Sequence, residues 1–227
     1  MEAAGNFRGN MDAPKARRRR LHIPTGPVIA VLVTLVLAAL CVPPPSNLLR
    51  AQLTQTMHNG RQVYLATYNM AADGLQQHDP HLGWPGDLAT AAIDPVHDLA
   101  SFAERLNRYD YISDADLGKM FVAPGIPAFR GPGKFSGENS AFKIYLVTEA
   151  DDDKALFLAT KNFTFGRGLN AHTMPYGDRG FAIVAKGGNA RTGQKQQASN
   201  KELIGFMPGH RTSEDPGAET TANVWKD

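Results

Sequence analysis

Residues 46–74 read SNLLRAQLTQTMHNGRQVYLATYNMAADG. Within this stretch, residues suited to a buried helix face recur at steps of three and four, the spacing that places them on one side of an α-helix. They are Leu48, Leu49, Leu53, Met57, Val63, Tyr64, Ala66, Thr67, Met70 and Ala71. Ser46 or Asn47 can cap the start of the helix, and Gly74 is a usual C-terminal stop. We therefore predict an amphipathic helix over about residues 46–72.

A strongly apolar stretch precedes this helix. No charged side chain occurs between Ile23 and Leu49, and residues 28–42 read VIAVLVTLVLAALCV. A helix needs about 20 apolar residues to cross the hydrocarbon of a membrane. We therefore predict a transmembrane segment over residues 23–45. The basic residues Arg17–Arg20 lie just before it and are expected to stay in the cytoplasm, so that the rest of the chain is exported.

Other interpretations of this segment remain open. A cleaved signal peptide needs small residues at positions −3 and −1, whereas Ala38-Ala39-Leu40 before Cys41 places leucine at −1. A lipoprotein cut before Cys41 has the same disadvantage. Residues 18–21 (RRRL) are compatible with a twin-arginine signal. We favour an uncleaved anchor in which Cys41 faces lipid.

Composition excludes several classes of protein. The chain has 227 residues and one cysteine, so it closes no intramolecular disulfide and supplies no cysteine-rich zinc site. Residues 1–20 carry six basic and two acidic side chains, a net charge of +4, which leaves −2 for the remainder. A mildly acidic body argues against nucleic acid as a partner, because phosphate recognition needs a basic surface.

The rest of the chain predicts an α+β fold. Two further helices are expected, one starting at Pro95 with proline at the first helical position and one over residues 113–121. The second half of the chain contains β-branched and aromatic runs. The predicted strands are 141–148, 155–163 and 180–186, the first two forming a hairpin, and the predicted loops are 75–94 and 124–140. The expected divisions are a basic cytoplasmic arm (1–22), a transmembrane segment (23–45), an exported α+β domain (46–210) and a flexible tail (211–227).

Four motifs occur in an order that points to a family. They are Leu37-Ala38-Ala39-Leu40, the run Asn59–Gly74 (NGRQVYLATYNMAADG), Met120–Pro124 (MFVAP), and Pro175–Val184 (PYGDRGFAIV) followed by Lys186-Gly187-Gly188. In this order they resemble type II secretion pseudopilins and type IV pilin-like proteins. The prepilin peptidase motif Gly-Phe-Thr-Leu-Ile-Glu is replaced at residues 21–26 by LHIPTG, so we predict that the N-terminal arm is retained.

The resemblance implies a fold, a location and partners. The fold is a long N-terminal helix, first transmembrane and then amphipathic, packed on a small antiparallel sheet. The protein is then a non-enzymatic, single-pass component of the bacterial inner membrane, with a cytoplasmic N-terminus and a periplasmic domain. Its partners are membrane lipid and other pilin-like subunits, with Ala30, Ala38 and Ala39 allowing close contact between helices in lipid. The residues expected to join helix and sheet are Val63, Leu65, Ala66, Tyr68 and Met70 on the helix, and Ile144, Leu146, Leu158, Ile183 and Val184 on the strands.

The alternative is a signal-anchored exported enzyme or metal-binding protein. Its site would use imidazole and carboxylate groups, although their spacing matches no standard ligand pattern. The candidates are His78, His81, Asp87 and His97. Ser140 and Lys143 fit the Ser-x-x-Lys spacing of penicillin-recognising enzymes, but they lie in a β-rich run rather than at a helix start. We interpret that match as coincidence, and we assign no catalytic, cofactor-binding or metal-binding residue.

Two further features allow both a binding and a structural interpretation. Asp151-Asp152-Asp153 offers oxygens to calcium, which some pseudopilins bind, but such a run is also typical of a charged hairpin tip that blocks edge pairing. The aromatic residues at strand spacing are predicted to be core. They are Phe157, Phe163, Phe165 and Phe181. Trp84 is predicted to pin its loop onto the sheet.

Overall fold

The computed structural model describes residues 45–131, 133–209 and 224–225. Their first element is the 33-residue helix α2 (Pro45–Gln77), at the start of a unit that begins at Pro45. The shorter helices are α3 (Pro85–Ala89), α4 (Leu99–Arg108), α5 (Asp114–Met120) and α6 (Lys201–Ile204), with 3-10 turns η1 (Gly137–Asn139) and η2 (Lys195–Gln197). The predicted cytoplasmic arm and transmembrane segment lie outside the described residues. Within the described ranges, no helix combines the length and apolarity needed to cross a membrane.

Five strands form one antiparallel sheet. Its strands are β1 (Phe142–Tyr145), β2 (Leu156–Thr160), β5 (Phe181–Ala185), β6 (Ala190–Gly193) and β7 (Val224–Trp225), in the order β6-β5-β2-β1-β7. The predicted hairpin is confirmed, because β1 pairs with β2 in the register Phe142↔Thr160. The third predicted strand is confirmed as β5. A separate two-stranded ribbon consists of β3 (Phe163–Thr164) and β4 (Gly168–Leu169). The α+β class is therefore correct.

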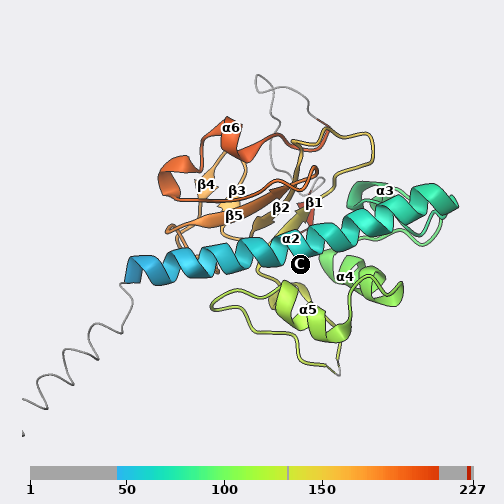
Figure 1. Cartoon of the computed structure of the whole chain (residues 1–227), viewed down its shortest axis with the longest axis horizontal. Helices are drawn as coiled ribbons and strands as arrows, with labels where there is room; N and C mark the ends of the chain where they lie inside the picture. The colour runs from blue at the N-terminus through green and yellow to red at the C-terminus, as the bar shows by residue number, and fades with distance from the viewer. Residues whose placement is uncertain (1–44, 132, 210–223, 226–227) are drawn as a thin grey trace, which may run out of the picture. The chain divides into compact units, whose positions relative to one another are not determined.

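Helix α2 runs along one face of the sheet, where it contacts β2, β5 and β6, and it also contacts α4 and α5 (Figure 1). Its buried residues include Val63, Ala66 and Met70. Gly60 allows the closest approach, since a Cβ there would lie 3.0 Å from Leu158 Cδ2. A glycine inside a helix costs about 1 kcal/mol relative to alanine, and here it permits helix and sheet to touch.

The ends of α2 differ from the prediction. The described part of α2 already includes both Ser46 and Asn47 within the helix, so neither occupies the predicted cap position. It also continues past Gly74 to Gln77. Gly74 is needed for packing instead, because a Cβ there would lie 2.3 Å from the Leu82 carbonyl oxygen. The left-handed residue that follows the helix is His78, with φ of 55°.

Three expected helix–sheet contacts are wrong. Leu65 and Tyr68 are exposed on α2, because their positions lie on the side of the helix away from the sheet. Ile183 belongs to the opposite face of the sheet. Among the other expected residues, Ile144, Leu158 and Val184 share a buried cluster with Val63, Ala66 and Met70.

Helix α4 begins at Leu99, four residues later than predicted. Asp98 caps it, since its Oδ1 accepts a hydrogen bond from Ser101 N at 2.6 Å. Pro95 instead follows Asp94, whose φ of 49° marks a turn. The prediction of α5 is confirmed, and Ser113 caps it through Asp116 N.

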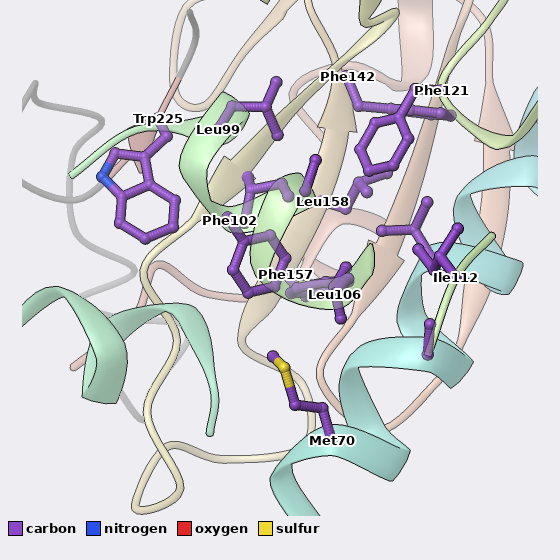
Figure 2. Close-up of a cluster of buried hydrophobic side chains, with 14 of the residues drawn as sticks. Met70, Leu99, Phe102, Leu106, Ile112, Phe121, Phe142, Phe157, Leu158 and Trp225 are labelled. Carbon is purple, nitrogen blue, oxygen red and sulfur yellow. The ribbon is translucent and has the colours of Figure 1, made fainter. Parts of the chain in front are cut away.

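Two hydrophobic clusters lie on the two faces of the sheet. The larger fills the space between α2, α4, α5 and the sheet, and Figure 2 shows part of it around Phe102, Leu106 and Phe157. The smaller cluster includes side chains from the sheet, the β3–β4 ribbon and α6. The four aromatic residues predicted as core are all buried, Phe157 in the larger cluster and Phe163, Phe165 and Phe181 in the smaller one.

The predicted flexible tail contains a strand. Val224 and Trp225, the part of 211–227 that the structure describes, pair with Tyr145 and Ile144 as β7. Trp225 is buried, and its ring centre lies 5.9 Å from that of Phe102 on α4. The expectation of a flexible tail is therefore wrong for these two residues. The large apolar indole of Trp225 is stabilised by burial, although most of the surrounding tail is polar.

Candidate interaction surface

Trp84 lies at the start of α3 and is 3% exposed. Its ring centre is 5.8 Å from that of Phe157 on β2, and its Nε1 donates a hydrogen bond to Glu149 Oε2 at 2.8 Å. Gly86 brings α3 onto the end of β1, since a Cβ there would lie 2.5 Å from the Leu146 carbonyl oxygen. The predicted role of Trp84, holding this loop onto the sheet, is confirmed.

Two tyrosines of α2 lie beside this tryptophan. The ring centres of Tyr64 and Tyr68 are 6.0 Å apart, and they lie 6.2 and 6.5 Å from that of Trp84. Tyr64 is half-buried, whereas Tyr68 is 50% exposed. We call Tyr64, Tyr68 and Trp84 the aromatic cluster.

The ammonium of Lys186 lies beneath this cluster. Lys186 follows β5 and is 7% exposed. Its Nζ donates to the carbonyl oxygens of Glu149 and Asp151, at 2.6 and 2.7 Å. It also lies 5.6 Å from the centre of the Trp84 ring, within range of a cation–π interaction. Gly188 then turns the chain with φ of +81°, where a Cβ would lie 2.7 Å from the Tyr64 ring.

Carboxylates surround the cluster on the side of the β1–β2 loop. Asp87 Oδ2 accepts from Glu149 N at 2.9 Å. Burial, and to a lesser extent the Glu149 charge, raises the pKa of Asp87 above its usual value. Burial also raises the pKa of Tyr64, with smaller contributions from Tyr68 and Asp153. Carboxylates and the Lys186 ammonium thus both lie close to the aromatic cluster.

These groups form a pocket of about 390 Å³. Its wall includes the aromatic cluster together with Glu149, Asp153 and Lys186. We call it the aromatic–acidic pocket. An apolar stripe on the outer face of α2 extends through and beyond the pocket, with Leu65, Tyr68 and Leu75 exposed by 41%, 50% and 58%. Exposed apolar side chains that adjoin a pocket are typical of an interaction surface.

The histidines and Asp87 of the alternative site serve separate parts of the fold. His78 ends α2, and Asp87 accepts a hydrogen bond from Glu149 N. The backbone of His81 contacts Asp79 and Arg105, and His97 is exposed next to the α4 cap. Across the described part of the chain, no three histidine, cysteine, aspartate or glutamate side chains are grouped so as to hold a metal ion.

Ser140 and Lys143 are both buried at the start of β1. The Ser140 hydroxyl donates to the Phe142 carbonyl and accepts from the Phe142 N–H, at 2.9 and 3.0 Å. Ser140 follows η1 rather than beginning a helix. This geometry differs from that required of an acylating serine.

Two of the three aspartates accept hydrogen bonds from backbone N–H groups. Asp151 Oδ2 accepts from Thr148 N and its Oδ1 accepts from Gly209 N, while Asp152 Oδ1 accepts from Lys154 N. The carbonyl oxygens of Glu149 and Asp151 already accept from the Lys186 ammonium. A cation of the chain itself thus occupies two backbone oxygens of this loop.

Sequence reasoning did not find the aromatic–acidic pocket. The apolar period of α2 predicts Tyr64 on the buried helix face, and the sequence places Lys186 at the end of a strand, before Gly187 and Gly188. The available signal was the spacing of Leu65, Tyr68, Ala72 and Leu75, which places a second apolar stripe on α2. Comparison with known protein families, curated proteins and solved structures finds no match to this chain.

Proposed function

We propose that this protein is a membrane-anchored, pseudopilin-like structural subunit of a type II secretion or type IV pilus-like apparatus. It is a non-enzymatic, single-pass protein of the bacterial inner membrane, with its N-terminus in the cytoplasm and its α+β domain in the periplasm. The observation that carries the proposal is α2, which packs along an antiparallel sheet and whose first described residue, Pro45, is the last residue of the predicted membrane segment.

The residues that carry the resemblance lie where α2 joins the rest of the domain. Asn59 Nδ2 donates to the carbonyl oxygens of Lys119 and Val122 at the end of α5. Asp73 Oδ2 accepts from the Tyr111 hydroxyl at 2.6 Å. Together with the close packing at Gly60 and Gly74, these contacts support a helix that is an integral part of the domain.

A second contact with α2 comes from the motif PYGDRGFAIV (residues 175–184), the last of the motifs that carry the resemblance. Tyr176 lies near the N-terminal half of α2, where its hydroxyl is 2.7 Å from Thr56 Oγ1 and donates to the Gln52 carbonyl at 2.9 Å. The helix is thus held near both ends, by Tyr176 and by Tyr111. A rod fixed in this way would transmit force between a membrane anchor and the exported domain, as an assembling subunit requires.

Cross-linking of the full-length protein in membranes tests the proposal. An amine-reactive cross-linker should give a ladder of subunit multiples, and changing Ala38 and Ala39 together to leucine should weaken it, because large side chains prevent close helix contact in lipid. Gly133→Ala is a matched control in the exported domain, at a position with no atom within 4 Å of the new Cβ. A monomer at every cross-linker concentration would contradict assembly.

Reporter fusions test the orientation separately. Fusions after Arg20 should report the cytoplasm, and fusions after Asn47 should report the periplasm. An exported signal from the first fusion would reverse the assigned topology. Intact mass from membranes should show the retained N-terminal arm, and a mature start at Leu21 would show that a prepilin peptidase accepts residues 21–26.

A further inference from the structure

We propose that the outer edge of β6 binds an acidic, extended peptide segment of another protein, which adds to the sheet as a further strand. The inference goes beyond the proposed function and does not depend on it. It rests on the position of β6 at the end of the sheet, on the direction of its backbone groups, and on the basic side chains beside it.

Strand β6 ends the sheet on the side opposite β7. The strand order is β6-β5-β2-β1-β7, so one side of Ala190–Gly193 pairs with β5, and the other side has no neighbouring strand among the described residues. The strand contains no proline, so each of its residues keeps a backbone N–H. An unpaired strand edge is a template for a further strand, and strand addition is a recurring mode of peptide recognition.

The pairing of β6 with β5 shows which backbone groups are already used. Ala185 N donates to the Asn189 carbonyl oxygen at 2.9 Å, so these residues form a hydrogen-bonded pair beside the turn. Hydrogen-bonded pairs alternate with other pairs along an antiparallel ladder. The next hydrogen-bonded pair is therefore Ile183↔Arg191, and the backbone groups of Arg191 point toward β5.

The neighbouring residues of β6 point the other way. By the same alternation, the N–H and C=O groups of Ala190 and Thr192 point away from β5. In the part of the chain that the structure describes, no hydrogen bond from another element reaches these groups. They are the donors and acceptors that an added strand would use.

A pocket of about 410 Å³ lies beside this edge, and we call it the edge pocket. Its wall includes the apolar side chains Ile183, Ile204 and Phe206. Arg191 also lines it, because Arg191 is opposite Ile183 in the register and its side chain lies on the same face of the sheet. A strand paired with β6 would place every second side chain on this face.

Basic side chains lie beside β6 on both faces of the sheet. Lys154 and Arg191 line the edge pocket, where Arg191 donates to a neutral group, the Glu202 carbonyl oxygen, at 3.3 Å. On the other face, Arg50 of α2 lines a second pocket together with Thr192. The linings of the two pockets contain three basic side chains and one acidic side chain, that of Glu202. An acidic segment complements this charge.

The same charges argue against a second copy of this chain as the occupant. Two β6 strands paired edge to edge would place two Arg191 side chains within one short ladder, and like charges on neighbouring strands destabilise a sheet. Basic side chains on an edge strand commonly prevent such pairing. An acidic strand instead gains an ion pair with Arg191 across the ladder.

Peptide binding to the purified full-length protein in a neutral detergent tests the inference. The probe is a fluorescent peptide of about six residues, the usual length of a strand, in which glutamate and valine alternate. Fluorescence anisotropy should show saturable binding. The same peptide with N-methylated central residues keeps its charge but cannot pair its backbone, so it should bind about tenfold more weakly. Equal binding of the two peptides, or no saturable binding, would overturn the proposal.

Charge reversal on β6 tests the electrostatic part. Arg191→Glu should weaken binding of the acidic peptide about tenfold, the equivalent of ~1.4 kcal/mol. Arg130→Glu makes the same charge change at an exposed position that lines neither pocket, and it should leave binding unchanged. Arg191 is exposed as well, so both variants should melt like the parent. Unchanged binding in Arg191→Glu would contradict the assigned partner.

Amide hydrogen exchange measured by NMR reads the backbone contact directly. Without peptide, the amides of Ala190 and Thr192 should exchange faster than that of Arg191, which bonds to β5. The acidic peptide should slow exchange at Ala190 and Thr192, and exchange rates that stay the same would overturn strand addition. Protection that rises with protein concentration alone would show that a second copy covers this edge, which would also overturn the proposal.

Discussion

The hydroxyl of Tyr111 donates a hydrogen bond to Asp73 Oδ2 at 2.6 Å, across 38 residues of sequence. It joins the segment between α4 and α5 to the last turns of α2. Burial, followed by the hydrogen bond to Asp73 and its charge, raises the pKa of Tyr111 well above its usual value. The folded protein therefore holds this proton more tightly than the unfolded chain does.

This difference predicts sensitivity to alkali. Below pH 10, the ordinary pKa of tyrosine, Tyr111 is neutral in both states and its contribution to stability is fully present. Above pH 10 the unfolded chain ionises first, so the free energy of unfolding should fall as pH rises. Tyr111→Phe should show a smaller fall in urea unfolding measured at neutral and alkaline pH. Part of the fall should remain, because Tyr64 and Tyr176 also have raised pKa values. An identical fall in the variant would contradict this role.

Lys186→Met should destabilise the protein by about 1–3 kcal/mol, because the carbonyl oxygens of Glu149 and Asp151 lose their donor. Thermal melting measures the effect. Lys154→Met is the matched control at an exposed lysine of the same region and should melt like the parent. In the parent, EDTA should leave the melting temperature unchanged, since the loop already holds an ammonium. A drop on adding EDTA would indicate a bound metal ion instead.

Gly74→Ala should destabilise the protein even though alanine is the better helix former. The gain in helix propensity is about 1 kcal/mol, but the new Cβ would lie 2.3 Å from the Leu82 carbonyl oxygen. Forcing these backbones apart costs about 1–3 kcal/mol. Denaturant melts compare this variant with Gly133→Ala, where a Cβ meets nothing within 4 Å. Equal stability of the two variants would show that α2 can shift freely.

Ala66→Asp and Leu65→Asp place the same charge on adjacent positions of α2. Ala66 is buried against the sheet, so an unpaired carboxylate there should cost on the order of 3 kcal/mol. Leu65 is 41% exposed, and its substitution should change stability by less than about 0.5 kcal/mol. If both variants melt alike, α2 is a tether and not part of the core.

Local patterns predicted the long helix, the hairpin and β5, because their apolar periods are set within a few residues. The start of α4 was also readable, since Asp98 and Ser101 have the spacing of a helix cap. Pro95 misled the prediction because a proline suits a turn as well as a first helical position. The sequence thus contained the correct signal, the spacing of Asp98 and Ser101, close to the more conspicuous Pro95.

The aromatic–acidic pocket could not be predicted in this way. Its members come from α2, the α3 turn, the β1–β2 loop and the end of β5, and only the folded chain brings them together. Lys186 follows a strand and precedes two glycines, which suggests a turn and nothing about its buried ammonium. The exposure of Tyr68 depends on which side of α2 meets the sheet. Helix α2 has two apolar stripes, and its sequence does not show which of them packs on the sheet.

The pairing of β7 with β1 has a consequence for biosynthesis. Strand β1 is made about 80 residues before its neighbour Val224–Trp225, so one edge of β1 has no β7 partner until the ribosome has added those two residues. An unpaired strand edge is a template for association with other nascent or unfolded chains. The interval between the synthesis of Phe142 and Trp225 is therefore the period in which this domain most needs a chaperone.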